Sequence, residues 1–252
     1  MTFPDAQPLV PLVEGQRVDF DVIVSLVPQG ARVLDLGCGA GELMLRLARE
    51  RGALAQGVDL HQPSVTACIS QGLSVFHGDI HEGLADLPDD SFDYVILSRT
   101  LQQVPDPDVV IRQMLRVGPR AIVSFPNFAY WRIRLHLLLH GKLPVSSALP
   151  YAWYNTPNIR LITIADFEDF CEKEGFAVLE RIAMEIGDGS LPPKISRGNG
   201  WTEAEHPCAN EIYTALERLS RQIDCCECPA EMPRGADWYG EYGMFVLGRK
   251  HE

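Results

Sequence analysis

Three things are scarce or missing in this sequence, and each excludes a class of protein. No run of about 18 consecutive apolar residues occurs, and the first ten residues hold no basic start followed by an apolar stretch, so neither a membrane span nor a secretion signal is expected. Basic residues number 22 against 34 acidic ones, and the net charge of -12 should repel nucleic-acid phosphates and anionic lipid. We therefore expect a cytoplasmic protein that binds neither nucleic acid nor a membrane.

A disulfide framework is missing as well. The seven cysteines are an odd number, and four of them gather at Cys208, Cys225, Cys226 and Cys228, which predicts reduced thiols. Together with His206 this cluster could supply metal ligands, but it lacks the paired Cys-x-x-Cys spacing of common zinc modules. The cluster could be a metal site or a group of reduced thiols, and of these two we expect reduced thiols without a metal.

What the sequence does contain is a regular alternation of apolar strand and helix patterns. It predicts strands over residues 32–37, 53–60, 73–77, 92–97, 120–125, 176–186 and 243–248. It predicts helices over residues 16–27, 42–51, 63–71, 106–116, 128–140 and 163–175. Alternation of this kind indicates a doubly wound α/β fold, with a mostly parallel seven-stranded sheet and helices on both faces.

The same reading predicts one domain. Residues 1–15, with three prolines and no periodicity, are expected to form a flexible lead-in to a single domain over residues 16–252. A segment of about residues 187–240, which holds the cysteine cluster, is expected to be an insertion before the last strand and not a second core.

A glycine turn joins the first predicted strand to the following helix. The stretch Asp35-Leu-Gly37-Cys-Gly39-Ala-Gly41 places three glycines where an open α/β sheet presents backbone N–H groups and a helix N-terminus to a ligand. A Cβ there would block close approach of that ligand to the backbone. The spacing differs from the Gly-x-Gly-x-x-Gly of dinucleotide enzymes, and no Lys-Ser/Thr follows as in a P-loop, so nicotinamide and nucleoside triphosphates are disfavoured.

Two carboxylates follow at the ends of the next strands. Asp59 ends the second strand, where a carboxylate can accept hydrogen bonds from both hydroxyls of a ribose. Asp79 follows the third strand and can accept from an exocyclic adenine amine, while Ile80 packs on the ring. As a set, these residues predict a nucleoside-containing ligand.

The glycine turn and the two carboxylates together resemble the class I S-adenosylmethionine-dependent methyltransferase fold. The resemblance implies S-adenosylmethionine or S-adenosylhomocysteine as cofactor, with the glycines facing its methionine part and Asp59 its ribose. The candidate cofactor-binding residues are Asp35, Gly37, Gly39, Gly41, Asp59, Leu60, Asp79, Ile80 and Ser98.

A narrower resemblance rests on further stretches of the chain. Val33–Leu43, Asp93–Ser98, Ile122–Phe128, Trp131-Arg132 and Leu149–Ile159 resemble the family of the methionine biosynthesis protein MetW. That resemblance implies partnership with homoserine O-acyltransferase in methionine synthesis and does not by itself imply methyl transfer. The sequence departs from the family pattern at His81, Arg99 and Arg160 and in the segment of about residues 187–240.

Catalytic residues are left unassigned. Methyl transfer mainly requires alignment of a nucleophile with the sulfonium carbon, so the absence of a histidine after the fourth strand does not decide activity. An active small-molecule methyltransferase is therefore the alternative to a subunit of the acyltransferase, and a scaffold with a vestigial site ranks last. Tyr151, Trp153, Tyr154 and Asn155 could line a substrate pocket or form the packing core of their own loop. His136 and His140 are expected to flank an amphipathic packing helix and not to bind a metal.

Charge is also unevenly distributed. No acidic residue occurs between Asp108 and Asp166, whereas this stretch carries seven basic residues. Solvated helix faces would explain the bias, and so would a cationic surface for an acidic substrate or partner protein. If the stretch contacts a partner, Trp131 beside Arg132 is the expected anchor, because Trp and Arg dominate the binding energy of protein interfaces.

Overall fold

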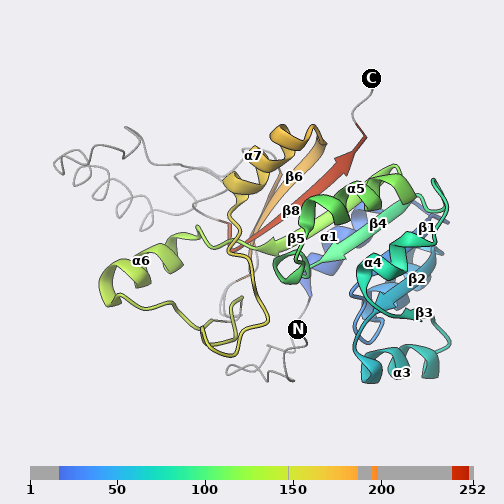
Figure 1. Ribbon diagram of the computed structural model, residues 1–252, viewed down its shortest axis with the longest axis horizontal. Coiled ribbons are helices and arrows are strands. Elements are labelled where there is room, and N and C mark those ends of the chain that lie inside the picture. The colour runs from blue at the N-terminus through green and yellow to red at the C-terminus, as the bar shows by residue number, and fades with distance from the viewer. Residues whose placement is uncertain (1–16, 147, 187–193, 198–239, 250–252) are drawn as a thin grey trace.

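One sheet organises the protein (Figure 1). The structure, a computed structural model, describes residues 17–146, 148–186, 194–197 and 240–249. Within them eight strands pair in the order β3-β2-β1-β4-β5-β8-β6-β7. The first five are parallel, whereas β8 is antiparallel to both β5 and β6, and β7 is antiparallel to β6. The strands are β1 (Arg32–Leu36), β2 (Leu54–Asp59), β3 (Ser74–His77), β4 (Tyr94–Ser98), β5 (Arg120–Pro126), β6 (Ala177–Glu185), β7 (Lys194–Arg197) and β8 (Tyr242–Gly248).

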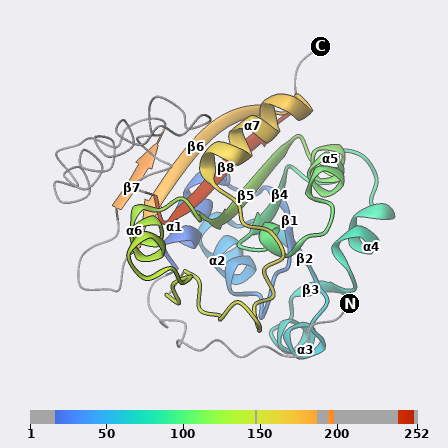
Figure 2. The ribbon, with the colours of Figure 1, turned by 60° about the vertical axis from the view of Figure 1, so that its left-hand side comes forward.

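Helices cover both faces of this sheet (Figures 1 and 2). One buried cluster joins the sheet to α4, α5 and α7, and a second joins it to α1 and α2. Apolar residues recur along α5 so that Val110, Ile111, Met114 and Leu115 all face the sheet and are buried. The helices are α1 (Val18–Leu26), α2 (Glu42–Arg51), α3 (Gln62–Ser70), α4 (Ile80–Ala85), the 3₁₀ turn η1 (Leu101–Gln103), α5 (Pro107–Val117), α6 (Trp131–His140) and α7 (Ile164–Glu174).

The predicted doubly wound α/β fold is therefore confirmed, and the strand number is corrected from seven to eight. The additional strand is β7, which pairs with Ile182–Glu185 at the edge of the sheet and lies in the segment expected to be an insertion. Four residues that alternate between half-buried and exposed give too short a pattern to be recognised in a sequence. The same holds for α4, which has only six residues. Residues 1–15 and the cysteine cluster lie outside the described residues, so the predictions about them are not tested.

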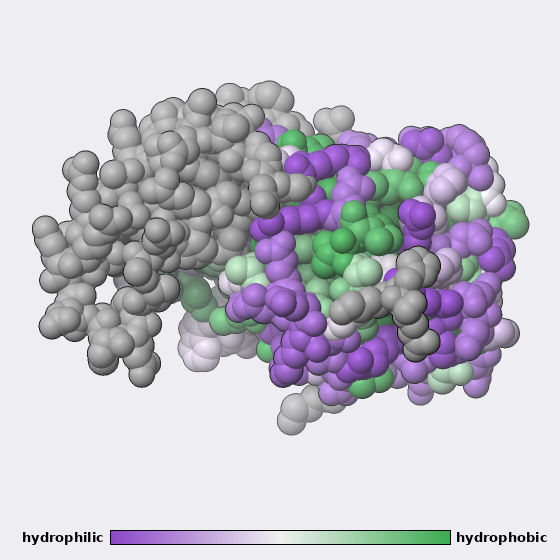
Figure 3. Space-filling model, turned by 90° about the horizontal axis from the view of Figure 1, so that it is seen from above, coloured by the Kyte–Doolittle hydropathy of each residue, from purple (hydrophilic) through white to green (hydrophobic). Residues whose placement is uncertain are grey.

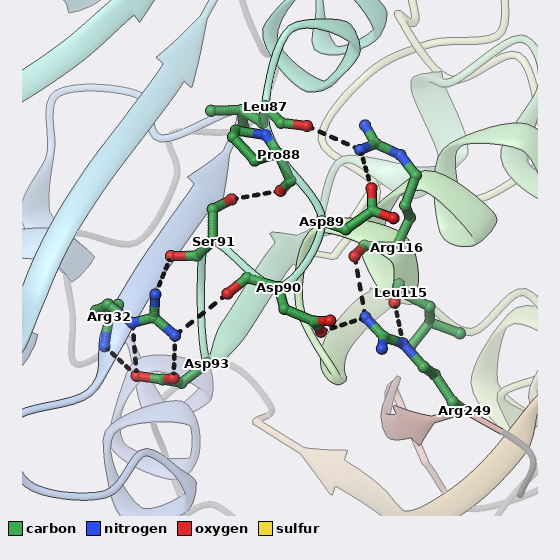
Figure 4. A network of polar contacts seen from close by, with 10 residues as sticks. All are labelled: Arg32, Leu87, Pro88, Asp89, Asp90, Ser91, Asp93, Leu115, Arg116 and Arg249. Carbon is green, nitrogen blue, oxygen red and sulfur yellow. Dashed lines mark hydrogen bonds and ion pairs between the residues drawn. The ribbon is translucent and has the colours of Figure 1, made fainter.

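Three arginines from different elements fix the loop that precedes β4 (Figure 4). Arg32 begins β1, Arg116 lies on α5 and Arg249 follows β8. The loop leads into the amino end of β4, whereas the glycine turn follows the carboxyl end of the parallel strand β1. The network and the glycine turn therefore lie at opposite ends of the strands. Ion pairs of 2.6 to 2.7 Å join each arginine to one aspartate of the loop, namely Arg32–Asp93, Arg116–Asp89 and Arg249–Asp90.

Exposed apolar side chains are unevenly distributed over the described residues. In the middle of the face seen from above, and apart from α6, an apolar area is framed by hydrophilic side chains (Figure 3). Of the seventeen large apolar side chains that are exposed in the described part of the chain, nine lie within residues 137–161, on α6 and the segment that follows it. Such a concentration needs a physical explanation, because contiguous exposed apolar patches are rare on monomeric proteins.

Candidate functional site

The glycine turn lies between β1 and α2, as predicted, and is held against β2. The backbone N–H groups of Gly37 and Cys38 both donate to the carbonyl of Val58, at 2.8 and 3.2 Å. All three glycines of the turn have positive φ, namely +72° for Gly37, +54° for Gly39 and +84° for Gly41. Glycine adopts this left-handed conformation without the steric cost that other residues incur, so the sequence pattern follows directly from the shape of the turn.

The three glycines nevertheless serve different purposes. A Cβ on Gly37 would lie 2.8 Å from Oγ1 of Thr100, and one on Gly41 would lie 2.3 Å from Cδ1 of Leu73, so both glycines make room for the protein's own side chains. A Cβ on Gly39 would meet nothing within 4 Å. Of the three, Gly39 is therefore the position where a ligand can approach bare backbone.

Asp59 links the end of β2 to this turn. Its Oδ2 accepts a hydrogen bond of 2.7 Å from the N–H of Gly39, and its Oδ1 accepts one of 2.8 Å from the N–H of His61. A carboxylate oxygen can accept more than one hydrogen bond, so both oxygens keep capacity for the hydroxyl groups of a ligand. The neighbouring Leu60 is exposed beside the same strand end.

Asp79 has a structural role that the sequence did not predict. It is the N-cap of α4, where its Oδ1 accepts a 2.7 Å hydrogen bond from the N–H of His81 and Glu82 completes a capping box. Ile80 begins the helix and packs, half-buried, against the larger core cluster. The cap uses the Asp79 side chain as an acceptor, and because a carboxylate oxygen can accept more than one hydrogen bond, the side chain keeps capacity for a ligand.

Asp35, on β1, is a buried carboxylic acid beside the turn. Only 3% of its surface is exposed. Burial raises its pKa to about 7, the charge of Asp59 adds to this effect, and the charge of Arg17 opposes it. Asp35 is therefore the carboxyl group of this site whose pKa is shifted most, and it changes protonation near neutral pH.

Cys38, inside the turn, behaves as a buried small side chain. Burial raises the pKa of its thiol, so it is protonated and a poor nucleophile. A Cβ on Gly57 of β2 would lie 2.5 Å from the sulfur, which shows how tightly Cys38 fills the space between turn and strand. Cys38 therefore fills space in the turn and is not a reactive group.

A buried ion cluster at the carboxyl end of β4 was missed by the sequence reasoning. Its centre is Asp19 of α1, which is 0% exposed. Arg17 binds it through Nε and Nη2 at 3.0 and 2.8 Å, and Nη2 of Arg99 donates to Oδ1 at 3.0 Å. Burial alone would raise the pKa of Asp19, but these two arginines outweigh that effect and hold it below its usual value.

Arg99 is held in an unusual conformation within this cluster. Its φ of +53° lies in the left-handed region, where non-glycine residues are uncommon. Its N–H donates to the carbonyl of Ser124 at 2.9 Å, and its guanidinium lies 4.2 Å from the ring centroid of Tyr242. Ser98, a predicted cofactor residue, is part of the same network, because its hydroxyl lies 3.4 Å from Oδ2 of Asp19 and 3.2 Å from Oγ of Ser124. Nothing local in the sequence distinguishes buried Asp19 from half-buried Asp21 on the same short helix.

A separate cavity of about 530 Å³ lies away from the glycine turn. Its lining comes from Phe128, before α6, and from the segment after α6, and it includes Lys142, Leu143, Tyr151 and Trp153 but no predicted cofactor residue. Tyr151 and Trp153 therefore line a cavity, as one interpretation held, but Tyr154 and Asn155 do not, and no residue of the glycine turn lines it.

The expected packing of α6 is wrong. The helix was expected to pack through one apolar face, but of its ten residues only Ile133 is buried. His136 and His140 stack with ring centroids 4.4 Å apart. No group of three metal-ligating side chains occurs among the residues that the structure describes, and no helix among them is long and apolar enough to span a bilayer.

Comparison with protein families points to one of them. The family described as "Methionine biosynthesis protein MetW" matches residues 17–204. A relative from Rhodopirellula baltica, the bifunctional methionine biosynthesis protein MetXA/MetW, is 37% identical over 195 residues, which are 73% of this chain. The chain spans only 31% of that longer protein. A demethylmenaquinone methyltransferase of Listeria monocytogenes is 28% identical over 182 residues, covering 64% of this chain and 76% of the relative.

Solved structures share the fold at low sequence identity. A methyltransferase from Archaeoglobus fulgidus that depends on S-adenosylmethionine superposes with a TM-score of 0.59 at 18% identity and covers 92% of both chains. A possible histamine N-methyltransferase from Thermotoga maritima gives a TM-score of 0.57 at 16% identity over 92% of this chain and 87% of the other. These similarities confirm the class I methyltransferase-like fold.

Proposed function

This chain belongs to the methionine biosynthesis protein MetW family, and from that premise we propose that it binds S-adenosylmethionine or S-adenosylhomocysteine and acts together with a homoserine O-acyltransferase. The two parts have separate support. Cofactor binding is supported by the geometry of the glycine turn, and the partnership by the relative in which a MetXA part and a MetW part share one chain.

The observation that carries the cofactor proposal is the bond between Asp59 and Gly39. It brings a carboxylate from β2 to within 2.7 Å of the one turn glycine whose outer side is open. A nucleoside ligand needs such a pair, because its ribose hydroxyls bind a carboxylate while its neighbouring part lies against bare backbone. The residues present therefore fit the ligand.

In this proposal each residue of the glycine turn and its neighbours has a separate role in ligand binding. Gly37 and Gly41 shape the turn, Gly39 admits the ligand, and Asp59 binds the ribose hydroxyls. Buried Asp35 offers a negative charge to the cationic methionine part once it is deprotonated. S-adenosylmethionine, when bound, would supply an electrophilic methyl group on a sulfonium. Further ligand contacts are proposed for Leu60, Asp79, Ile80 and Ser98.

Calorimetry on the intact protein tests the cofactor proposal. Replacing Asp59 by alanine should weaken binding of S-adenosylmethionine or S-adenosylhomocysteine by about 2 to 4 kcal/mol, or roughly 30- to 1000-fold, because charge-assisted hydrogen bonds are lost. Asp106→Ala is the matched control, since Asp106 is exposed and its side chain makes no cap hydrogen bond. If the wild-type protein binds neither ligand at millimolar concentration, the proposal is rejected.

Methyl transfer to a small molecule is the second candidate. The similarity to a demethylmenaquinone methyltransferase covers 64% of this chain, which favours keeping this alternative. It predicts that S-adenosylhomocysteine accumulates when the protein is incubated with S-adenosylmethionine and the acceptor. If the complex with the acyltransferase forms and no S-adenosylhomocysteine is released with any quinol acceptor, the subunit proposal is favoured.

A further inference from the structure

Among the described helices of eight or more residues, α6 has the fewest buried residues, and it lies apart from the sheet (Figure 1). One of its ten residues is buried, compared with five of eleven on α5. Three consecutive leucines near its end, Leu137, Leu138 and Leu139, have 46%, 61% and 66% of their surface exposed. A helix of ten residues is marginally stable in water on its own, so such a helix is expected to be covered when the protein works.

The exposed apolar surface continues beyond the end of α6. The cavity of about 530 Å³ begins at Gly141, directly after the helix, and is lined by Leu143 and Trp153 among others. Trp153 is 79% exposed and Leu161, in the same lining, is 65% exposed. We call the group of Leu137, Leu138, Leu139, Leu143, Trp153 and Leu161 the α6 surface.

The charged side chains that α6 and the segment after it contribute have one sign. No acidic residue occurs between Asp108 and Asp166, and Arg132, Lys142 and Arg160 are exposed within that stretch. The guanidinium of Arg132 lies 5.3 Å from the ring centroid of Trp131. We call these three basic residues the cationic rim, and Lys142 lines the same cavity as Leu143 and Trp153, although the net charge of the whole chain is -12.

We propose that the α6 surface docks a partner protein whose contact face has an apolar ridge flanked by carboxylates, and that this partner is the acyltransferase. The identification of the partner rests on the proposed function. The apolar ridge would fill the cavity beside Trp153, and the carboxylates would face the cationic rim. Complementary charge of this kind speeds association and selects the partner.

The charges argue against two other occupants. In a symmetric dimer a second copy of this chain would bring its own cationic rim against this one, and like charges across an interface oppose association. An anionic membrane would attract the rim but repel the chain as a whole, with its net charge of -12. An acidic protein surface meets neither objection.

The expected anchor of the contact changes from Trp131 to Trp153. Trp131 is only partly exposed and packs against two buried clusters, so its role is structural. Trp153 is exposed and lines the cavity, which is the position expected of a residue that dominates binding. Arg134 is also less suited than Arg132, because its Nε donates to the carbonyl of Ala129.

Binding of the purified acyltransferase, measured as a Kd at low salt, tests the proposal. Leu138→Glu and Leu139→Glu should each raise the Kd at least about 30-fold, because a charge would enter an apolar contact. Ile69→Glu is the matched control, since Ile69 on α3 is 62% exposed and lies far from α6 in both ribbon views (Figures 1 and 2). All three positions are exposed, so the variants should keep the wild-type melting temperature.

Charge reversal provides an independent measurement. Arg132→Glu and Lys142→Glu should raise the Kd and flatten its dependence on salt, whereas Arg49→Glu on α2 should change neither. If the acyltransferase binds wild type and the α6 variants equally, the α6 surface is the wrong interface while the partnership stands. If the acyltransferase does not bind the wild-type protein at all, both the partnership and its identification as the partner at the α6 surface are rejected. Self-association or binding to phosphatidylglycerol vesicles that Leu138→Glu abolishes would also overturn the proposed occupant.

Discussion

The buried carboxyl of Asp35 makes a quantitative prediction about stability and pH. Its pKa is about 7 in the folded protein, against an ordinary value of 3.8. Because the folded state holds this proton more tightly than the unfolded state, Asp35 costs the fold nothing below about pH 4, an increasing amount between about pH 4 and pH 7, and a constant amount above that. Replacing it by asparagine, which has a similar shape and no charge, should remove that cost.

The expected size follows from the two pKa values. The cost of Asp35 is about 1.5 kcal/mol at pH 5 and about 4 kcal/mol at pH 8, since one unit of pKa corresponds to about 1.4 kcal/mol. The unfolding free energy of Asp35→Asn, relative to wild type, should therefore increase by about 2.5 kcal/mol between pH 5 and pH 8. Other titrating groups are common to both proteins and cancel in the difference.

Urea denaturation followed by tryptophan fluorescence at several pH values measures this difference. Asp93→Asn is the control of opposite sign. Hydrogen bonds from Arg32 lower the pKa of Asp93, so its contribution is fully present above its unfolded pKa and constant from pH 5 to 8. If the difference between wild type and Asp35→Asn stays constant over this range, Asp35 is not the buried neutral acid described above.

Three further changes test other parts of the structure. Gly41→Ala should destabilise the protein by about 2 kcal/mol or more, because its Cβ would clash, while Gly39→Ala should cost less stability and instead weaken S-adenosylmethionine binding in calorimetry. Thr163→Ala should lower the unfolding free energy in urea by about 1 kcal/mol, because the hydroxyl of Thr163 caps α7; an unchanged value would contradict the cap. Asp19→Asn should cost about 3 kcal/mol by leaving half-buried Arg99 beside a neutral partner, and a loss below about 0.5 kcal/mol would show that the cluster is dispensable.

The parts of the site that could be predicted are those that follow from strand order. Parallel strands place their carboxyl ends at one edge, so a glycine turn after β1 and an aspartate at the end of β2 were expected to meet, and Asp59 does bind Gly39. The cap at Thr163 was also predictable, because it depends on residues three apart in sequence.

The parts that could not be predicted depend on contacts between distant segments. Asp19 and Arg99 lie 80 positions apart, and nothing local distinguishes an aspartate that will be buried from one that will be exposed. The leucines of α6 predict a helix correctly, but the sequence does not say whether another element covers them. For the same reason the sequence could not decide whether the loop aromatics line a pocket or form the packing core of their own loop.

The position of β8 has a consequence for how the chain reaches its native state. This strand follows every other described element in the sequence, yet it lies between β5 and β6, and all seven of its residues are buried. Until residues 242–248 emerge from the ribosome, one edge of β5 therefore has no strand to pair with. Over the same period no strand joins the pair of β6 and β7 to the parallel half of the sheet. Such long-range pairing makes folding slow and leaves two open edges exposed to other chains in the interval. The protein should accordingly depend on chaperones more than a sheet completed in sequence order, and truncation before Tyr242 should yield aggregates and not a smaller folded domain.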